Sequence, residues 1–292
     1  MFIRNIYRTI KYSIMGNYLG AYLNYLINND KQFENELSIV AIVKNEAPYI
    51  KEWIEFHKLV GVEKFYIYDN ASEDNLKEVL LSYIKNGEVV YKFYPGKGMQ
   101  TKAYMDAVKK YRNKTKWLAV IDLDEFIVPI KGDKITDAIN SIQSEGEKEI
   151  ASLAVNWANY GYSGHFEKPE GLVIKNYTMR ETTNIHIKVI VNPRTVVYFN
   201  NPHYAVQHLF DSYLINENHQ KINGPFSEPS IEKIRINHYW TKSYSEFTKK
   251  IERGFADCND SREIPPYDPN YLSEYEDKIM DKYIPVLEKL LV

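Results

Sequence analysis

Two carboxylates one residue apart, Asp122 and Asp124, are the side chains of this sequence best suited to chemistry. They directly follow residues 117–121, an apolar run (WLAVI) that predicts a buried strand. Side chains at positions i and i+2 of an extended chain point the same way, so the two carboxylates are expected to converge. Such a pair is costly at the end of an apolar strand unless a cation compensates it. The pattern therefore predicts a divalent-metal site that binds substrate phosphates, with solvated acids of a turn as the alternative.

A later histidine, His238, is a candidate third ligand of that ion. It follows an alternating, strand-like stretch, and Mn²⁺ accepts imidazole nitrogen beside carboxylate oxygen. Lys242 and Ser243 come shortly afterwards and are candidates to bind diphosphate oxygens. On spacing alone, a purely structural histidine is the alternative.

The first half of the chain alternates between strand and helix patterns. Strands are predicted over residues 37–43, 64–68, 89–93 and 117–121, and helices over about 48–60, 74–86 and 100–112. This alternation predicts an α/β fold, a mostly parallel sheet with helices on both faces. Ligands of such sheets bind beyond the carboxyl ends of the strands. The segments expected to gather there are Lys44-Asn45-Glu46, Asp69-Asn70, residues 95–100 and residues 122–125.

The second half is more irregular. It predicts strands over residues 150–157, 172–179, 185–191 and 194–199, and helices over 243–254 and 271–291. Without a repeat or a linker, residues 35–292 are interpreted as one domain with two lobes, 35–130 and 131–292.

The N-terminal residues 1–34 need a separate interpretation. Residues 12–29 carry no charge, but polar side chains and glycines interrupt them too often for a membrane span. We expect a helical segment that either packs on the domain or lies as an anchor at a membrane surface.

Composition narrows the class of protein further. The chain has 292 residues, 44% hydrophobic and 26% charged, which is typical of a soluble globular protein. Its net charge of −2 argues against a nucleic-acid partner. The single cysteine, Cys258, excludes a disulfide within the chain and favours a reducing compartment. The sequence contains no P-loop, no dinucleotide-binding glycine motif and no G-x-S-x-G, which disfavours the enzymes that use them.

Together, several motifs in order resemble glycosyltransferase family 92 and its bacterial family 2-like relatives. The matching residues are Val43-Lys44-Asn45-Glu46 with Tyr49, Glu52-Trp53 and His57; Tyr68-Asp69-Asn70-Ala71-Ser72 with Asp74; Gln100 and Tyr104; Asp122-Leu123-Asp124-Glu125-Phe126; Trp157 and residues 160–165; and Asn237-His238-Tyr239, Lys242-Ser243, Phe247, Lys250 and Arg253-Gly254. They span residues 38–256, most of the chain.

The resemblance implies a GT-A fold: a nucleotide-sugar-binding mixed sheet flanked by helices, followed by a more irregular, acceptor-side lobe. It also implies an inverting reaction that depends on Mn²⁺ or Mg²⁺. Asp122 would contact ribose or the metal-bound phosphates, and Asp124 and His238 would hold the metal together with Asp122. The residues implied to bind nucleotide or substrate are Lys44, Asn45, Glu46, Asp69, Asn70, Gln100, Tyr104, Lys242 and Ser243, with Trp157 a candidate to stack on a sugar.

The residue that deprotonates the acceptor stays open between three candidates. His165 lies in a glycine-flanked loop, Glu181 is a carboxylate near an expected strand end, and Glu125 adjoins the metal motif.

The function expected from the sequence is transfer of a hexose, such as galactose, from a UDP-sugar to a glycan acceptor. A bacterial surface polysaccharide, glycosylated at the cytoplasmic face of the membrane, is the expected acceptor. A non-catalytic carbohydrate-binding protein, favoured by 25 tyrosines, and a nucleotidyltransferase are the alternatives.

Overall fold

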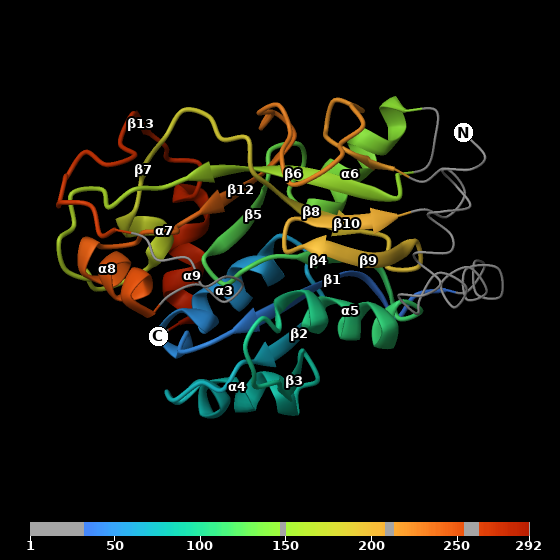
Figure 1. Cartoon of the computed structure of the whole chain (residues 1–292), viewed down its shortest axis with the longest axis horizontal. Coiled ribbons are helices and arrows are strands. Elements are labelled where there is room, and N and C mark those ends of the chain that lie inside the picture. Colours follow the sequence, from blue (N-terminus) through green and yellow to red (C-terminus); the bar gives the residue numbers. More distant parts are fainter. Residues whose placement is uncertain (1–31, 147–149, 208–212, 254–262, 292) are drawn as a thin grey trace.

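The computed structural model describes residues 32–146, 150–207, 213–253 and 263–291 (Figure 1). The predicted segment 1–34 lies outside these residues except for its last three positions, and Cys258 lies outside them as well. Among the described helices, none is both long and apolar enough to cross a bilayer.

The central element is a mixed sheet of nine strands. Its order is β3-β2-β1-β4-β8-β6-β12-β5, with β11 paired to β6. The strands are β1 (Asn35–Val43), β2 (Lys64–Asp69), β3 (Val89–Phe93), β4 (Thr115–Val120), β5 (Glu125–Pro129), β6 (Ser152–Asn159), β8 (Ile187–Val191), β11 (Leu214–Ile215) and β12 (Ile234–His238). The first four strands run parallel, β8 is antiparallel to both of its neighbours, and β12 is antiparallel to β5.

Helices cover both faces of this sheet, as Figure 1 shows. One face packs against α3 (Ala47–Leu59), α4 (Leu76–Lys85), α6 (Ile135–Glu145) and α9 (Ile284–Leu290). The other face packs against α5 (Gln100–Tyr111) and the hairpin of β9 (Val196–Asn201) and β10 (Tyr204–Gln207). Strand β1 shows why both faces are apolar: Ile39 and Ala41 enter the first core, whereas Val40 between them enters the second.

The predicted elements of the first half are confirmed within one or two residues at most ends. Gly61 and Gly87 follow α3 and α4 with φ angles of 97° and 75°, the left-handed conformation in which glycine ends helices. The prediction omitted β5, at the end of the first half, and α6, at the start of the second.

Two predictions in the second half are wrong. Residues 172–179, expected to be a strand, contain the short helix α7 (Val173–Asn176) and only the start of β7 (Met179–Arg180). The Glu52 side chain on α3 explains this, because its carboxylate accepts hydrogen bonds from the amides of Val173 (2.8 Å) and Ile174 (3.0 Å). A distant acid thus caps the first turn of α7.

The second wrong prediction is a helix over residues 271–291. This segment contains β13 (Tyr275–Glu276), a 3₁₀ turn (Asp281–Tyr283) and then α9. Asp277 accounts for the difference, because its carboxylate binds Arg180 (2.6 Å) and Arg235 (2.7 Å) from two other strands. These buried ion pairs hold β13 against β7 in place of a helical turn.

Candidate functional site

The segments after the first four strands meet at one edge of the sheet, as predicted. The Asn70 side-chain amide donates to the carbonyls of Tyr94 (3.0 Å) and Gly96 (2.9 Å). The Asn45 backbone amide donates to the Ser72 hydroxyl (3.0 Å). Asp69 accepts from the Tyr91 hydroxyl (2.5 Å), and Lys44 lies half-buried beside this group. The predicted nucleoside-binding residues therefore border one continuous polar edge.

Asp122 is held there by groups on two neighbouring elements. One carboxylate oxygen accepts from Gln100 (2.8 Å) and Tyr104 (3.2 Å), both on α5. The other accepts from the Lys188 ammonium on β8 at 2.8 Å. Burial raises the pKa of Asp122, but Lys188 outweighs it and the net pKa is lowered. Asp122 is thus an ionised carboxylate whose two oxygens both have protein partners.

Lys188 is a fully buried cation inside the apolar strand β8. Its ammonium also lies 3.9 Å from an oxygen of Glu125, which is fully buried too. The other Glu125 oxygen accepts from the Asp122 backbone amide (2.9 Å), which fixes the turn between β4 and β5. Burial raises the pKa of the Glu125 carboxyl well above its ordinary value. Glu125 therefore stabilises the turn that contains Asp122 and Asp124.

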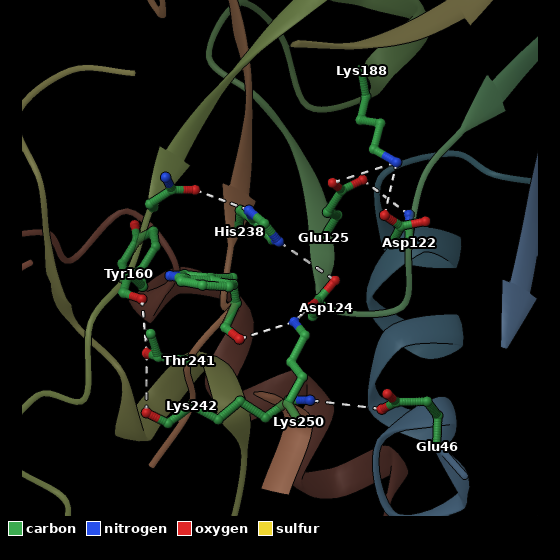
Figure 2. A network of polar contacts seen from close by, with 12 residues as sticks. Glu46, Asp122, Asp124, Glu125, Tyr160, Lys188, His238, Thr241, Lys242 and Lys250 are labelled. Atoms are coloured by element: carbon green, nitrogen blue, oxygen red, sulfur yellow. Dashed lines mark hydrogen bonds and ion pairs between the residues drawn. The ribbon is translucent and has the colours of Figure 1, made fainter. Parts of the chain in front are cut away.

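Asp124 lies between a lysine and a histidine, as Figure 2 shows. One oxygen contacts the Lys250 ammonium on α8 (Tyr244–Arg253) at 2.5 Å. The other lies 3.6 Å from Nε2 of His238, at the end of β12. Burial raises the pKa of Asp124, but the positive charge of Lys250 outweighs it and holds the pKa well below its ordinary value.

The environment of His238 indicates which ring nitrogen is free. Nδ1 lies 2.9 Å from the Asn159 amide oxygen, which only accepts, so Nδ1 carries the proton. Burial lowers the pKa of His238, so the ring is neutral and Nε2 presents a lone pair to Asp124. The Asp124 oxygen and His238 Nε2 therefore face each other at 3.6 Å with no proton between them. Both atoms have lone pairs that could coordinate a cation between them. Metal-binding histidines are oriented in the same way, through their other ring nitrogen.

The predicted metal triad is therefore assembled only in part. Asp124 and His238 are brought together, whereas both oxygens of Asp122 are engaged by Lys188, Gln100 and Tyr104. No group of three His, Cys, Asp or Glu side chains within the described ranges is arranged to hold a metal. The residues fit a divalent ion with two protein ligands, the remaining ligands coming from substrate phosphates and water.

The three candidate bases lie in different surroundings. Glu181 follows β7 and its backbone amide donates to the carbonyl of Asn159, the residue that orients His238. Burial raises the pKa of Glu181, and its carboxylate accepts from Asn184 at 2.6 Å. His165 instead faces the Asn176 carbonyl (3.2 Å) and packs edge-on against Tyr177. The backbone of Glu181 is therefore joined to Asn159 on β6, whereas Glu125, the third candidate, has no solvent access.

The remaining predicted residues lie around α8 and β6. Lys242 contacts Glu46 (3.6 Å) and lies over the Tyr49 ring (3.9 Å). The Ser243 hydroxyl donates to Glu246 (2.6 Å), which accepts from the Ser243 amide as well and closes the start of α8. Ser243 is fully buried in this arrangement and so has a structural partner where a diphosphate contact was expected.

Trp157 is brought to the site. Its ring lies 4.1 Å from that of His238, centroid to centroid.

Sequence reasoning missed Lys188 and Asn159, and it assigned no role to Lys250. Lys188 could have been noticed, because it is a lysine within the otherwise apolar run IKVIV over residues 187–191. No sequence pattern indicates Asn159, because its role depends on the parallel pairing of β6 with β12, which aligns Asn159 with His238.

Fold and site together define an α/β protein with acidic and basic side chains converging at the carboxyl edge of its sheet, an arrangement suited to a nucleotide diphosphate and a cation. The sequence profile of glycosyltransferase family 92 matches residues 38–261. The chain belongs to glycosyltransferase family 92, and the observed mixed sheet flanked by helices confirms the expected fold class.

Curated relatives are plant members of the same family. The chain is 28% identical over 226 residues to a glycosyltransferase family 92 protein of Ricinus communis, and 26% identical over 233 residues to one of Arabidopsis thaliana. Each alignment covers 76% of this chain and 38% of the relative. The chain thus matches well under half the length of these curated relatives.

Solved structures resemble the chain more remotely. Staphylococcus aureus TarS, crystallised with UDP-GlcNAc, is 13% identical with a TM-score of 0.41, covering 65% of this chain and 59% of that one. Glucosyl-3-phosphoglycerate synthase of Mycobacterium tuberculosis, with Mn²⁺ and UDP, is 18% identical with a TM-score of 0.29, covering 42% and 44%.

Proposed function

We propose that this protein is an inverting glycosyltransferase that moves a hexose from a UDP-sugar to a hydroxyl group of a glycan. The observation that carries the proposal is the pair of Asp124 and His238, 3.6 Å apart with an oriented lone pair, in a chain of family 92. Galactose as the donor hexose and a bacterial surface polysaccharide as the acceptor are predictions from the amino-acid sequence alone. The reducing compartment indicated by the single cysteine supports a cytoplasmic location.

Asp124 and His238 would hold the divalent ion, which neutralises charge on the departing diphosphate when bound. Lys250 contacts the other oxygen of Asp124 and so stabilises it as a carboxylate. Lys242, which contacts Glu46, would offer its ammonium to a phosphate. Asp122, fixed on both oxygens, would position the nucleotide rather than coordinate the ion.

Glu181 is the proposed base. The acceptor oxygen forms a bond to the anomeric carbon while the bond from that carbon to UDP breaks. The proton of the acceptor hydroxyl passes to the Glu181 carboxylate, and UDP leaves with the bonding electron pair. Partial burial raises the pKa of Glu181 towards neutrality, which suits a group that must take up a proton in this step.

The experiment that tests the proposal measures UDP binding and UDP release from a panel of UDP-sugars, each with and without Mn²⁺. Wild-type protein should bind UDP more tightly with Mn²⁺. The Asp124→Asn variant should lose that gain, by about tenfold or more, since it removes a charged ligand. Asp133→Asn is the matched control, because Asp133 is an exposed acid in the loop before α6.

Equal Mn²⁺ dependence in Asp124→Asn and wild type would contradict the assignment of the metal site. Release of pyrophosphate from a nucleoside triphosphate would identify a nucleotidyltransferase instead. Sugar binding without any binding of UDP would favour the carbohydrate-binding alternative.

A further inference from the structure

A series of ring contacts leads away from the proposed metal ligands. Beyond His238, the Trp157 ring stacks on His186 at 5.2 Å with an interplanar angle of 19°. The His186 ring meets Phe226 edge-on at 4.9 Å. Phe226 is half exposed, whereas Trp157 and His186 are partly buried. The series thus begins at the reaction centre and ends at the surface.

An open cavity of about 530 Å³ lies where this series reaches the surface. Its volume is in the range of about 300–1,000 Å³ that small-molecule sites occupy. Phe226 and Ile185 line it, and each is 50% exposed, which leaves two apolar surfaces facing solvent. The polar lining comes from Gln220, Lys221, Asn223 and Glu228.

Backbone hydrogen bonds hold this cavity in place. The Ser227 amide donates to the Ile185 carbonyl (2.9 Å), and the Ile187 amide donates to the Pro225 carbonyl (3.3 Å). His186 and Phe226 also form an isolated antiparallel bridge. The apolar surface of Phe226 is therefore fixed relative to β8, the strand that carries Lys188 at the other site. A preorganised surface loses little conformational entropy when a ligand binds.

We propose that this cavity binds a neutral sugar ring of the glycan acceptor, one that lies outside the position where transfer occurs. This inference rests on the proposed function, because the ring series that ends at the cavity begins at His238, a proposed metal ligand. The apolar face of a pyranose would pack on Phe226 and Ile185, while its hydroxyl groups would bond to the amides and charged groups of the rim. Lys221 and Glu228 carry opposite charges, so the lining favours a neutral sugar over an acidic one.

The test measures sugar binding to the full chain saturated with Mn²⁺ and UDP, and again without them. The probes are methyl β-galactoside, methyl β-glucoside, lactose and cellobiose, followed by saturation-transfer NMR. We expect the disaccharides to bind more tightly than the methyl glycosides, since only they reach beyond a single position. Phe226→Ala should weaken disaccharide binding by about fivefold to tenfold, and Phe226→Tyr should preserve it.

Leu290→Ala is the matched control, because Leu290 on α9 is 49% exposed and lies outside the cavity lining. UDP binding and melting temperature should be the same in all variants. Wild-type affinity in Phe226→Ala, equal loss in Leu290→Ala, or failure of wild-type protein to bind any of the four sugars would overturn the proposal. Sugars that bind through Phe226 in a protein that binds no UDP would support the sugar site and contradict the glycosyltransferase function.

Discussion

Replacement of Lys188 by methionine should destabilise the folded protein strongly, although the change keeps the length and apolar stem of the side chain. Lys188 is fully buried, and its ammonium lies 2.8 Å from an Asp122 oxygen and 3.9 Å from a Glu125 oxygen. Burial lowers the pKa of Lys188, but Asp122 and Glu125 outweigh it and raise the pKa overall. The variant would therefore leave an ionised Asp122 without its cation.

The magnitude follows from these distances. With an effective dielectric constant of about 20, the attraction between the Lys188 ammonium and the Asp122 carboxylate, 2.8 Å apart, is roughly 6 kcal/mol. The cost of burying the ammonium offsets much of this attraction, and Asp122 keeps some contact with solvent. Removal of one partner of a buried ion pair typically lowers the free energy of unfolding by about 3–5 kcal/mol. We expect Lys188→Met to lose about 3 kcal/mol.

The assay is equilibrium unfolding in urea at pH 7. Lys114→Met is the matched control, because Lys114 pairs with Glu34 on the surface and should change stability by less than about 1 kcal/mol. Adding Asp122→Asn to Lys188→Met should restore about 2 kcal/mol, since it removes the unpaired charge. A Lys188→Met protein as stable as the control, or a double variant no more stable than Lys188→Met, would refute this reasoning.

Two further predictions concern single carboxylates. Glu181→Gln should lower the rate of sugar transfer by about 100-fold or more while UDP binding stays unchanged, and His165→Gln should lower that rate far less. Steady-state kinetics of both variants would test this. A slower rate in His165→Gln than in Glu181→Gln would identify His165 as the base. Burial raises the pKa of Glu52 from 4.5 to about 7 in the folded protein, so the folded state binds more protons than the unfolded state between these values. Stability should therefore fall by up to about 3 kcal/mol as pH rises from 4.5 through 7. Urea unfolding across that range should show a shallower decline in Glu52→Gln, and parallel curves would contradict the role given to Glu52.

Local patterns in the sequence were sufficient to predict the fold from β1 to β4. The alternation of apolar strands with amphipathic helices, and the glycines after α3 and α4, depend on neighbours a few residues apart. The same patterns located the polar segments after the strands, including Asp122 and Asp124. The convergence of these segments follows because parallel strands end at one edge.

The second half could not be predicted in this way, because its structure depends on partners far away in the chain. Glu52 caps α7 across 121 residues, and Asp277 draws its segment towards Arg180 and Arg235. No periodicity records such a contact. Short segments of ambiguous pattern therefore took the conformation that a distant side chain stabilised.

Only the tertiary structure decided which positive side chains compensate the carboxylates of the candidate site. The sequence predicted a cation beside Asp122 and Asp124, and the fold supplies two lysines, Lys188 from β8 and Lys250 from α8. It also places His238 between Glu125 and Asn159, because β12 pairs with β5 on one side and β6 on the other. Residue types and their order indicate which chemistry a chain can carry. Which charges meet is decided by the order of strands in the sheet, since only that order brings residues more than 60 positions apart within a few ångströms.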